Sequence, residues 1–145
     1  MDAIERLTAA DEIRNLRARY CRAIDQKDRE AFRSVFARNA VADYREGRQD
    51  VEPMRGADAI TDVFMAALPS LITVHHCATG EIHVDTPDTA RGDWPMVARV
   101  LYPPGGKARE EIGYGFYHET YVREDGAWKI KTLALTRTRV DTIPA

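Results

Sequence analysis

The chain has 145 residues, of which 44% are hydrophobic and 30% are charged, a composition typical of one globular domain rather than of a disordered chain. Its 21 Lys and Arg and 23 Asp and Glu residues leave a net charge of -2, which argues against a nucleic-acid-binding protein. No apolar run approaches the ~18 residues that a membrane span needs, and the first residues contain no apolar signal-peptide core. We therefore expect a single soluble, cytoplasmic domain over residues 1–145 that binds neither nucleic acid nor membranes.

Three helices are predicted in the first half of the chain. The first carries apolar side chains at spacings of three and four residues, and the second begins at Asp28, a residue type that favours helix N-caps. A short strand over 40–44 and a polar loop over 45–50 come next. The third helix runs over 57–68 and ends before Pro69, which cannot continue a helix. The apolar stripe of the first helix consists of Ile13, Leu16, Tyr20 and Ile24.

The second half of the chain has the pattern of β-structure. Long runs of strand-forming residues are separated by turn signals, of which Asp125-Gly126 is a strong hairpin signal. Successive long strands joined by short turns indicate an antiparallel meander. Helices followed by strands are typical of an α+β domain whose helices pack on one face of a curved sheet. The four predicted strands span 72–84, 90–102, 110–123 and 128–140.

Both faces of this sheet carry large apolar side chains. On the third long strand, Tyr114 and Phe116 alternate with Tyr117. A sheet that is apolar on both faces needs two covers. The helices supply one cover, and an enclosed ligand cavity, a partner subunit, or both supply the other. We therefore predict that Tyr114 and Phe116 contact a bound substrate and that the chain self-associates.

The strongest candidates for chemistry are a pair of histidines and an aspartate. Histidine titrates near neutral pH and is the usual general base, and strand alternation places His75 and His76 on opposite faces without showing which face lines the cavity. Asp25, after the stripe of the first helix, could hold one ring nitrogen and stabilise the imidazolium. Tyr20 and Asp25 lie about 140° apart on an ideal helix, so both face one cavity only if the helix end bends or crosses the cavity mouth.

Three further polar residues have both a structural and a functional interpretation. Tyr20 could be a core tyrosine, and Tyr44 could be an aromatic residue at the rim of the domain. Arg137 lies on the same strand face as Leu133 and Leu135, where a buried guanidinium would need a partner. Its alternative interpretation is a solvated strand end.

Cofactor and cysteine signals are few. The sequence has no CxxC, HExxH, P-loop or GxGxxG motif, so we predict no metal and no organic cofactor. Cys21 and Cys77 are the two cysteines of the chain. In the absence of a secretory signal, we expect both to be free thiols that pack as small apolar residues.

Three segments resemble the SnoaL-like family of the nuclear-transport-factor-two-like superfamily. They are RARYCRAIDQKDREAFRSVFARNAVADY, TVHHCATGEIHVDTPDTARGDW and YVREDGAWKIKTLALTRTRVD. The superfamily also includes ketosteroid isomerase, scytalone dehydratase, hexachlorocyclohexane dehydrochlorinase and bile-acid 7α-dehydratase. The resemblance implies a cone-shaped α+β barrel, with about three N-terminal helices packed on a curved, mostly antiparallel sheet.

The resemblance also implies roles for individual residues. The catalytic histidine of the eliminating enzymes falls on His75. The Tyr-x4-Asp pattern of the bile-acid enzyme falls on Tyr20 and Asp25, and the tyrosine that ends its first strand falls on Tyr44. The arginine near the end of its last strand falls on Arg137, where it would help to close the pocket or bind an acidic group of the substrate.

Two positions depart from particular members of the superfamily. The dehydrochlorinase has a lysine where this chain has Tyr20, and scytalone dehydratase has a second histidine where this chain has Ile112. His118 lies on the same strand as Ile112 but out of register, so we assign it no role. These differences argue against both of those individual activities.

The resulting hypothesis is a cofactor-independent lyase, most simply a dehydratase, acting on a small hydrophobic cyclic or polycyclic substrate by general base catalysis at His75 and Asp25. One alternative is a ketosteroid-isomerase-like isomerase or a polyketide cyclase, because both reactions also begin with proton abstraction from carbon. The other is a non-enzymatic ligand-binding or assembly module. The resemblance further implies a homodimer or a homotrimer and does not choose between them.

Overall fold

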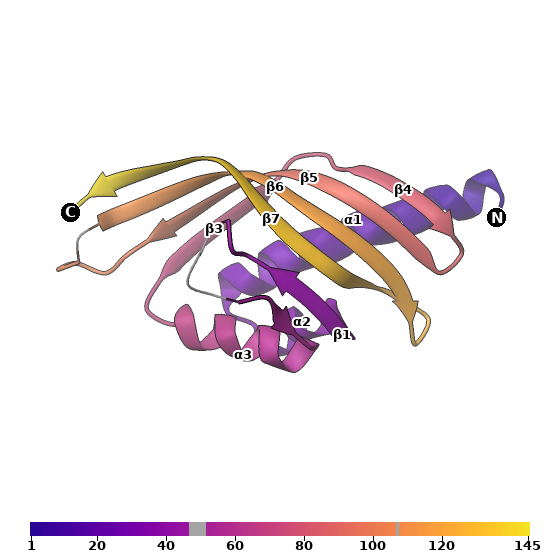
Figure 1. The fold of residues 1–145 in the computed structure, drawn as a ribbon, viewed down its shortest axis with the longest axis horizontal. Coiled ribbons are helices and arrows are strands. Elements are labelled where there is room, and N and C mark those ends of the chain that lie inside the picture. Colours follow the sequence, from indigo (N-terminus) through magenta and orange to yellow (C-terminus); the bar gives the residue numbers. More distant parts are fainter. Residues whose placement is uncertain (47–51, 107) are drawn as a thin grey trace.

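The computed structural model describes residues 1–46, 52–106 and 108–145. Within these residues the chain forms three helices and seven strands (Figure 1). No helix in the described ranges is both long and apolar enough to cross a membrane. The helices are α1 (Ala3–Gln26), α2 (Arg29–Ser34) and α3 (Ala57–Ala67). The strands are β1 (Phe36–Asp43), β2 (Met54–Arg55), β3 (Ile72–Cys77), β4 (Glu81–Thr86), β5 (Thr89–Leu101), β6 (Ala108–Glu124) and β7 (Ala127–Pro144).

The described strands form one sheet in the order β2-β1-β7-β6-β5-β3, and β4 also pairs with β5. Strands β5, β6 and β7 form the predicted antiparallel meander, whereas β1 joins β7 in parallel. The sheet is curved and open, with the helices on its concave side (Figure 1). The predicted α+β fold, with N-terminal helices on a curved and mostly antiparallel sheet, is confirmed, although the sheet does not close into a barrel.

Helix α1 is fixed at both ends by its own sequence. At its start, Asp2 accepts a hydrogen bond from the backbone N–H of Glu5 (2.8 Å), and the Glu5 carboxylate accepts one from the Asp2 backbone N–H (2.7 Å), which is a capping box. At its end, Lys27 adopts a left-handed conformation with φ 54°, a common way to end a helix. Between these ends, the predicted apolar stripe is buried against the sheet, so the periodicity located the face that packs on the core.

Two strand boundaries differ from the prediction. The segment 72–84 is not one strand, because β3 and β4 are separated by residues 78–80 and pair with different parts of β5. At the break, the backbone passes so close to Trp94 that a Cβ on Gly80 would overlap the indole ring. Strand β1 begins at Phe36, earlier than the predicted strand over 40–44. Residues 47–50 of the predicted polar loop lie outside the described residues.

A buried ion pair joins α1 to the middle of the sheet. Arg17 donates to the Glu119 carboxylate, and both side chains are almost wholly buried. The guanidinium carbon lies 3.8 Å from the ring centroids of both Tyr20 and Tyr117, so it is held between two aromatic faces. The hydroxyl of Tyr121 donates to the second oxygen of Glu119. This network fixes the orientation of the Tyr20 ring, because the Arg17 guanidinium packs on one face of that ring.

We predict that Glu119→Ala lowers the free energy of unfolding by about 3–5 kcal/mol, because it leaves the Arg17 charge buried without a partner. The matched control is Asp85→Ala, which breaks the exposed Arg91–Asp85 pair and should cost at most about 1 kcal/mol. Urea unfolding followed by circular dichroism measures both. Equal losses in the two variants would contradict the role given to the buried pair.

Candidate active site

A cavity of about 530 Å³ lies between the concave face of the sheet and the helices α1 and α3. Its volume is within the range of small-molecule sites. Most of its wall is apolar, and polar side chains enter it from several elements. The apolar lining includes Ile24, Phe64, Leu68, Leu71, Met96, Ala98, Val100 and Leu135, and the polar lining consists of Tyr20, Tyr44, Thr73, His75, Tyr102, Glu111, Tyr117 and Arg137.

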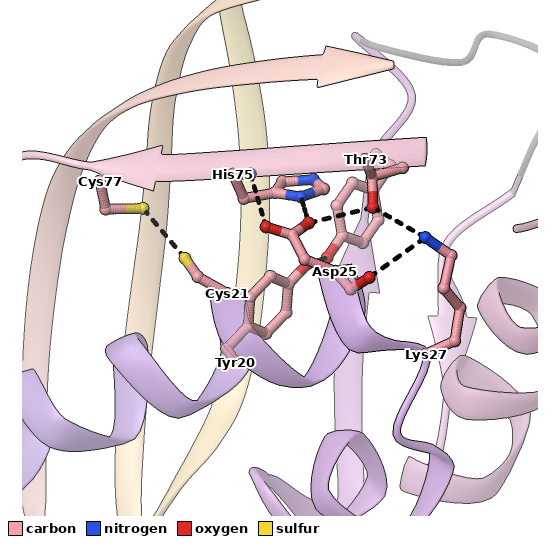
Figure 2. Close-up of polar contacts among 8 residues, drawn as sticks. Tyr20, Cys21, Asp25, Lys27, Thr73, His75 and Cys77 are labelled. Atoms are coloured by element: carbon pink, nitrogen blue, oxygen red, sulfur yellow. Dashed lines mark hydrogen bonds and ion pairs between the residues drawn. The ribbon is translucent and has the colours of Figure 1, made fainter. Parts of the chain in front are cut away.

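His75 and Asp25 form a close polar pair beside this cavity (Figure 2). The ring Nδ1 of His75 lies 2.6 Å from Asp25 Oδ1, and the backbone N–H of His75 donates to Asp25 Oδ2 at 2.8 Å. The hydroxyl of Thr73 donates to Oδ1 at 3.0 Å. A carboxylate can only accept hydrogen bonds, so the proton of the neutral imidazole is on Nδ1 and Nε2 is left as an unprotonated acceptor.

The surroundings keep Asp25 ionised. Burial alone would raise the pKa of Asp25, but the hydrogen bonds from the His75 ring, from the His75 backbone and from Thr73 outweigh burial and lower it. The carboxylate is therefore charged at neutral pH. A charged Asp25 stabilises the imidazolium that forms when His75 takes up a proton, and it fixes the ring orientation.

The structure resolves two questions that periodicity left open. His75 shares the inward face of β3 with Thr73 and Cys77, whereas His76 is exposed on the other face. Tyr20 lines the cavity, whereas Asp25 does not. The Asp25 carboxylate lies at the end of α1, against β3, and is connected to the cavity by its hydrogen bond to the His75 ring. The two residues can thus contribute to one site although they point in different directions from the helix.

Two tyrosines provide a second polar group in the cavity. The hydroxyls of Tyr20 and Tyr44 lie 2.6 Å apart, and both residues are buried. Burial raises the pKa of each phenol, so both remain neutral. When one hydroxyl donates to the other, the acceptor keeps its own O–H free to donate to a ligand. The pair can therefore stabilise negative charge on an oxygen that develops in the cavity.

Arg137 lines a further part of the cavity with Tyr102 and Glu111. The Tyr102 hydroxyl donates to Glu111 Oε2 at 2.7 Å. The Arg137 guanidinium packs over Gly113, where an added Cβ would lie 3.3 Å from its Cζ. Its Nε is buried and has no hydrogen-bond partner among the described residues. The Nε itself is covered by neighbouring atoms, so only the rest of the side chain can meet a ligand. Because Arg137 lines the cavity, it places a cationic residue in the wall that suits an acidic ligand group.

Sequence reasoning missed Tyr102 and Glu111 and misplaced two aromatic residues. Tyr117 of β6 faces the cavity, so by alternation Tyr114 and Phe116 lie on the opposite, convex face, and neither lines the cavity. Phe116 is 42% exposed and stacks on His118. The prediction that Tyr114 and Phe116 contact substrate is therefore corrected. Alternation from Tyr117 back to Glu111 was the signal that could have identified Glu111.

Metal-ligating side chains do not cluster in the described part of the chain. Within residues 1–46, 52–106 and 108–145, no group of three or more His, Cys, Asp or Glu side chains lies close enough to coordinate one. The polar groups of the cavity are four phenols, the Thr73 hydroxyl, one imidazole, one guanidinium and one carboxylate, which suit hydrogen bonding and proton transfer.

Several solved structures share this fold at low sequence identity. The Kfla4162 protein from Kribbella flavida superimposes with a TM-score of 0.85 at 21% identity, over 92% of this chain and 93% of that chain. A scytalone dehydratase-like protein from Novosphingobium aromaticivorans gives a TM-score of 0.83 at 21% identity, over 96% and 90%. The hexachlorocyclohexane dehydrochlorinase LinA type 2 gives 0.85 at 16% identity, over 99% and 95%. At these identities the similarity concerns the fold.

The sequence itself matches a defined protein family. The SnoaL-like domain family matches this chain over residues 5–134, which span α1 to the middle of β7. The matched region contains Asp25, His75 and the Tyr20–Tyr44 pair. The chain therefore belongs to the SnoaL-like family.

Proposed function

We propose that this protein is a dehydratase-like lyase that acts on a small, largely hydrophobic cyclic or polycyclic substrate. The observation that carries this proposal is the His75–Asp25 contact, which leaves Nε2 of His75 free beside a cavity that the Tyr20–Tyr44 pair also lines. A base and an oxyanion donor around one apolar space are what an elimination next to a carbonyl or aromatic group requires.

In the proposed reaction, His75 Nε2 removes a proton from carbon next to the activating group. Asp25 stabilises the imidazolium that results. The hydroxyls of Tyr20 and Tyr44 donate to the oxygen on which negative charge develops, or assist departure of the leaving hydroxyl. The largely apolar lining makes these interactions stronger than they would be in bulk water. All the acid–base groups of this scheme are side chains of the chain itself.

The alternative functions differ in what they require of this cavity and in the products they would form. An isomerase or a polyketide cyclase would use the same base and donors, and it would exchange solvent deuterium into a bound ketone without releasing water. A non-enzymatic assembly module would not need an open interior. The cavity of about 530 Å³ therefore supports a small-molecule function over an assembly role, and the proton-abstraction step is common to all of the enzymatic alternatives.

We predict that His75→Ala lowers the rate of elimination by about 10²–10⁴-fold, because it removes the general base. Asp25→Asn should also lower kcat strongly, because the imidazolium loses its charged partner and the ring its fixed tautomer. The measurement is product formation from a panel of cyclic substrates able to eliminate water. The matched control is His76→Ala, which changes an exposed histidine on the opposite face of the same strand and should leave the rate unchanged. Equal activity in wild type, His75→Ala and Asp25→Asn would remove the pair from the mechanism.

We also propose that Arg137 binds an acidic group of the substrate. Arg137→Leu should weaken binding of an acidic ligand by about 10–100-fold, because a hydrogen bond to a charged group is lost, and should leave binding of the corresponding neutral amide nearly unchanged. Titration calorimetry with the acid and amide of one cyclic ligand tests this.

The control for this prediction is Arg139→Leu, because Arg139 pairs with Asp141 at the surface and does not line the cavity. An equal loss of affinity for the acid and for the amide in Arg137→Leu would contradict the proposed contact.

A further inference from the structure

Two cysteines from distant parts of the chain face each other beside the His75–Asp25 pair. Cys21 is in α1, one helical turn before Asp25, and Cys77 is in β3, two residues after His75 on the same strand face (Figure 2). Their sulfur atoms lie 3.7 Å apart. Both cysteines are free and only partly buried. The two cysteines therefore connect α1 to β3, the same two elements that Asp25 and His75 connect.

We infer that Cys21 and Cys77 form a reversible dithiol–disulfide pair that fastens α1 to β3 beside the proposed active site. A disulfide bond is about 2.05 Å long, so the two sulfurs need to approach by less than about 2 Å. Side-chain rotation and small shifts at the contact between α1 and β3 can supply this approach. Formation of the disulfide does not depend on the proposed reaction, whereas its effect on catalysis rests on that proposed function.

The surroundings give the two thiols different roles. The hydrogen-bond contact with Cys21 and the nearby Arg17 guanidinium lower the pKa of the Cys77 thiol, against the opposing effect of burial. The hydrogen bond to Cys77 and burial both raise the pKa of Cys21. The thiolate is the form that attacks a disulfide. The Arg17 guanidinium also lies within hydrogen-bonding reach of the Cys77 sulfur and not of the Cys21 sulfur, so we assign Cys77 as the attacking thiol and Cys21 as the thiol that closes the bridge.

The oxidant in this scheme is a low-molecular-weight disulfide such as glutathione disulfide. The Cys77 thiolate attacks one of its sulfurs, the S–S bond breaks, and the first small thiol leaves with a proton. Cys21 then loses its proton and attacks the Cys77 sulfur, and the second small thiol leaves with that proton. In sum, two cysteine thiols are oxidised to one disulfide, and the small disulfide is reduced to two thiols.

The disulfide holds together the elements that carry Asp25 and His75. Asp25 is one turn from Cys21, and His75 is two residues from Cys77, so the cross-link fixes α1 against β3 next to the Asp25–His75 hydrogen bonds. A cross-link between segments far apart in sequence also stabilises the folded state by restricting the unfolded chain. Oxidation should therefore preserve the catalytic geometry and make the domain harder to unfold.

The experiment uses the full chain, treated with glutathione disulfide under native conditions. We expect an intact mass lower by about 2 Da than that of the reduced protein, with no retained adduct. We also expect a melting temperature higher by at least about 5 °C, and dithiothreitol should reverse both changes. Two free thiols, a retained glutathione adduct, or a disulfide between two chains would each overturn the inference.

Two single variants test the roles assigned to the thiols. Cys21→Ser should accumulate one glutathione adduct on Cys77, because the closing thiol is missing. Cys77→Ser should react more slowly, because burial raises the pKa of the Cys21 thiol also when the Cys77 sulfur is absent. Equal rates of adduct formation in the two variants, or faster reaction of Cys77→Ser, would contradict the assignment. Mass and melting temperature involve no substrate, so this inference can fail while the proposed function stands, and the reverse also holds.

Discussion

The contact between Asp25 and His75 joins the end of α1 to β3, two segments that lie 50 residues apart in the sequence. The carboxylate accepts from the ring, from the strand backbone and from Thr73 at the same time, so it fixes the position of the strand as well as the tautomer of the histidine. A histidine on a strand edge would otherwise be free to rotate and to protonate at either nitrogen. The proposed chemistry depends on this restriction, because only a ring held at Nδ1 presents a defined base to the cavity.

A second contact between α1 and the sheet fixes the position of the helix that carries Asp25. The buried Arg17–Glu119 pair joins the middle of α1 to β6, and the guanidinium lies between Tyr20 and Tyr117, both of which line the cavity. A buried charge pair is weak support for stability but defines position strictly, because a shifted partner leaves a charge uncompensated. The hydroxyl pair of Tyr20 and Tyr44 is thereby held at a fixed place in the same cavity as His75.

Much of the fold could be predicted from local patterns. The stripe of α1, the N-cap at Asp28 and the meander of β5 to β7 depend on periodicity and turn chemistry, which are local properties of the chain. The break between β3 and β4 was not predictable in this way, because it depends on contact of Gly80 with the distant Trp94. The site was predicted in part: alternation separated His75 from His76 but could not tell which one faces α1. The prediction that Tyr114 and Phe116 contact substrate was wrong, because a sheet with aromatic residues on both faces gives no local sign of which face the helices cover.

The tautomer of His75 reports directly whether Asp25 holds the ring at Nδ1. Nitrogen-15 NMR of protein labelled at histidine, with the signal assigned through His75→Gln, reports the protonation of each ring nitrogen. We expect that at neutral pH the neutral ring carries its proton on Nδ1, with Nε2 unprotonated, and that Asp25→Asn removes this preference. A neutral ring protonated at Nε2 in the wild type, or the same tautomer in both proteins, would show that Asp25 does not set the tautomer of His75.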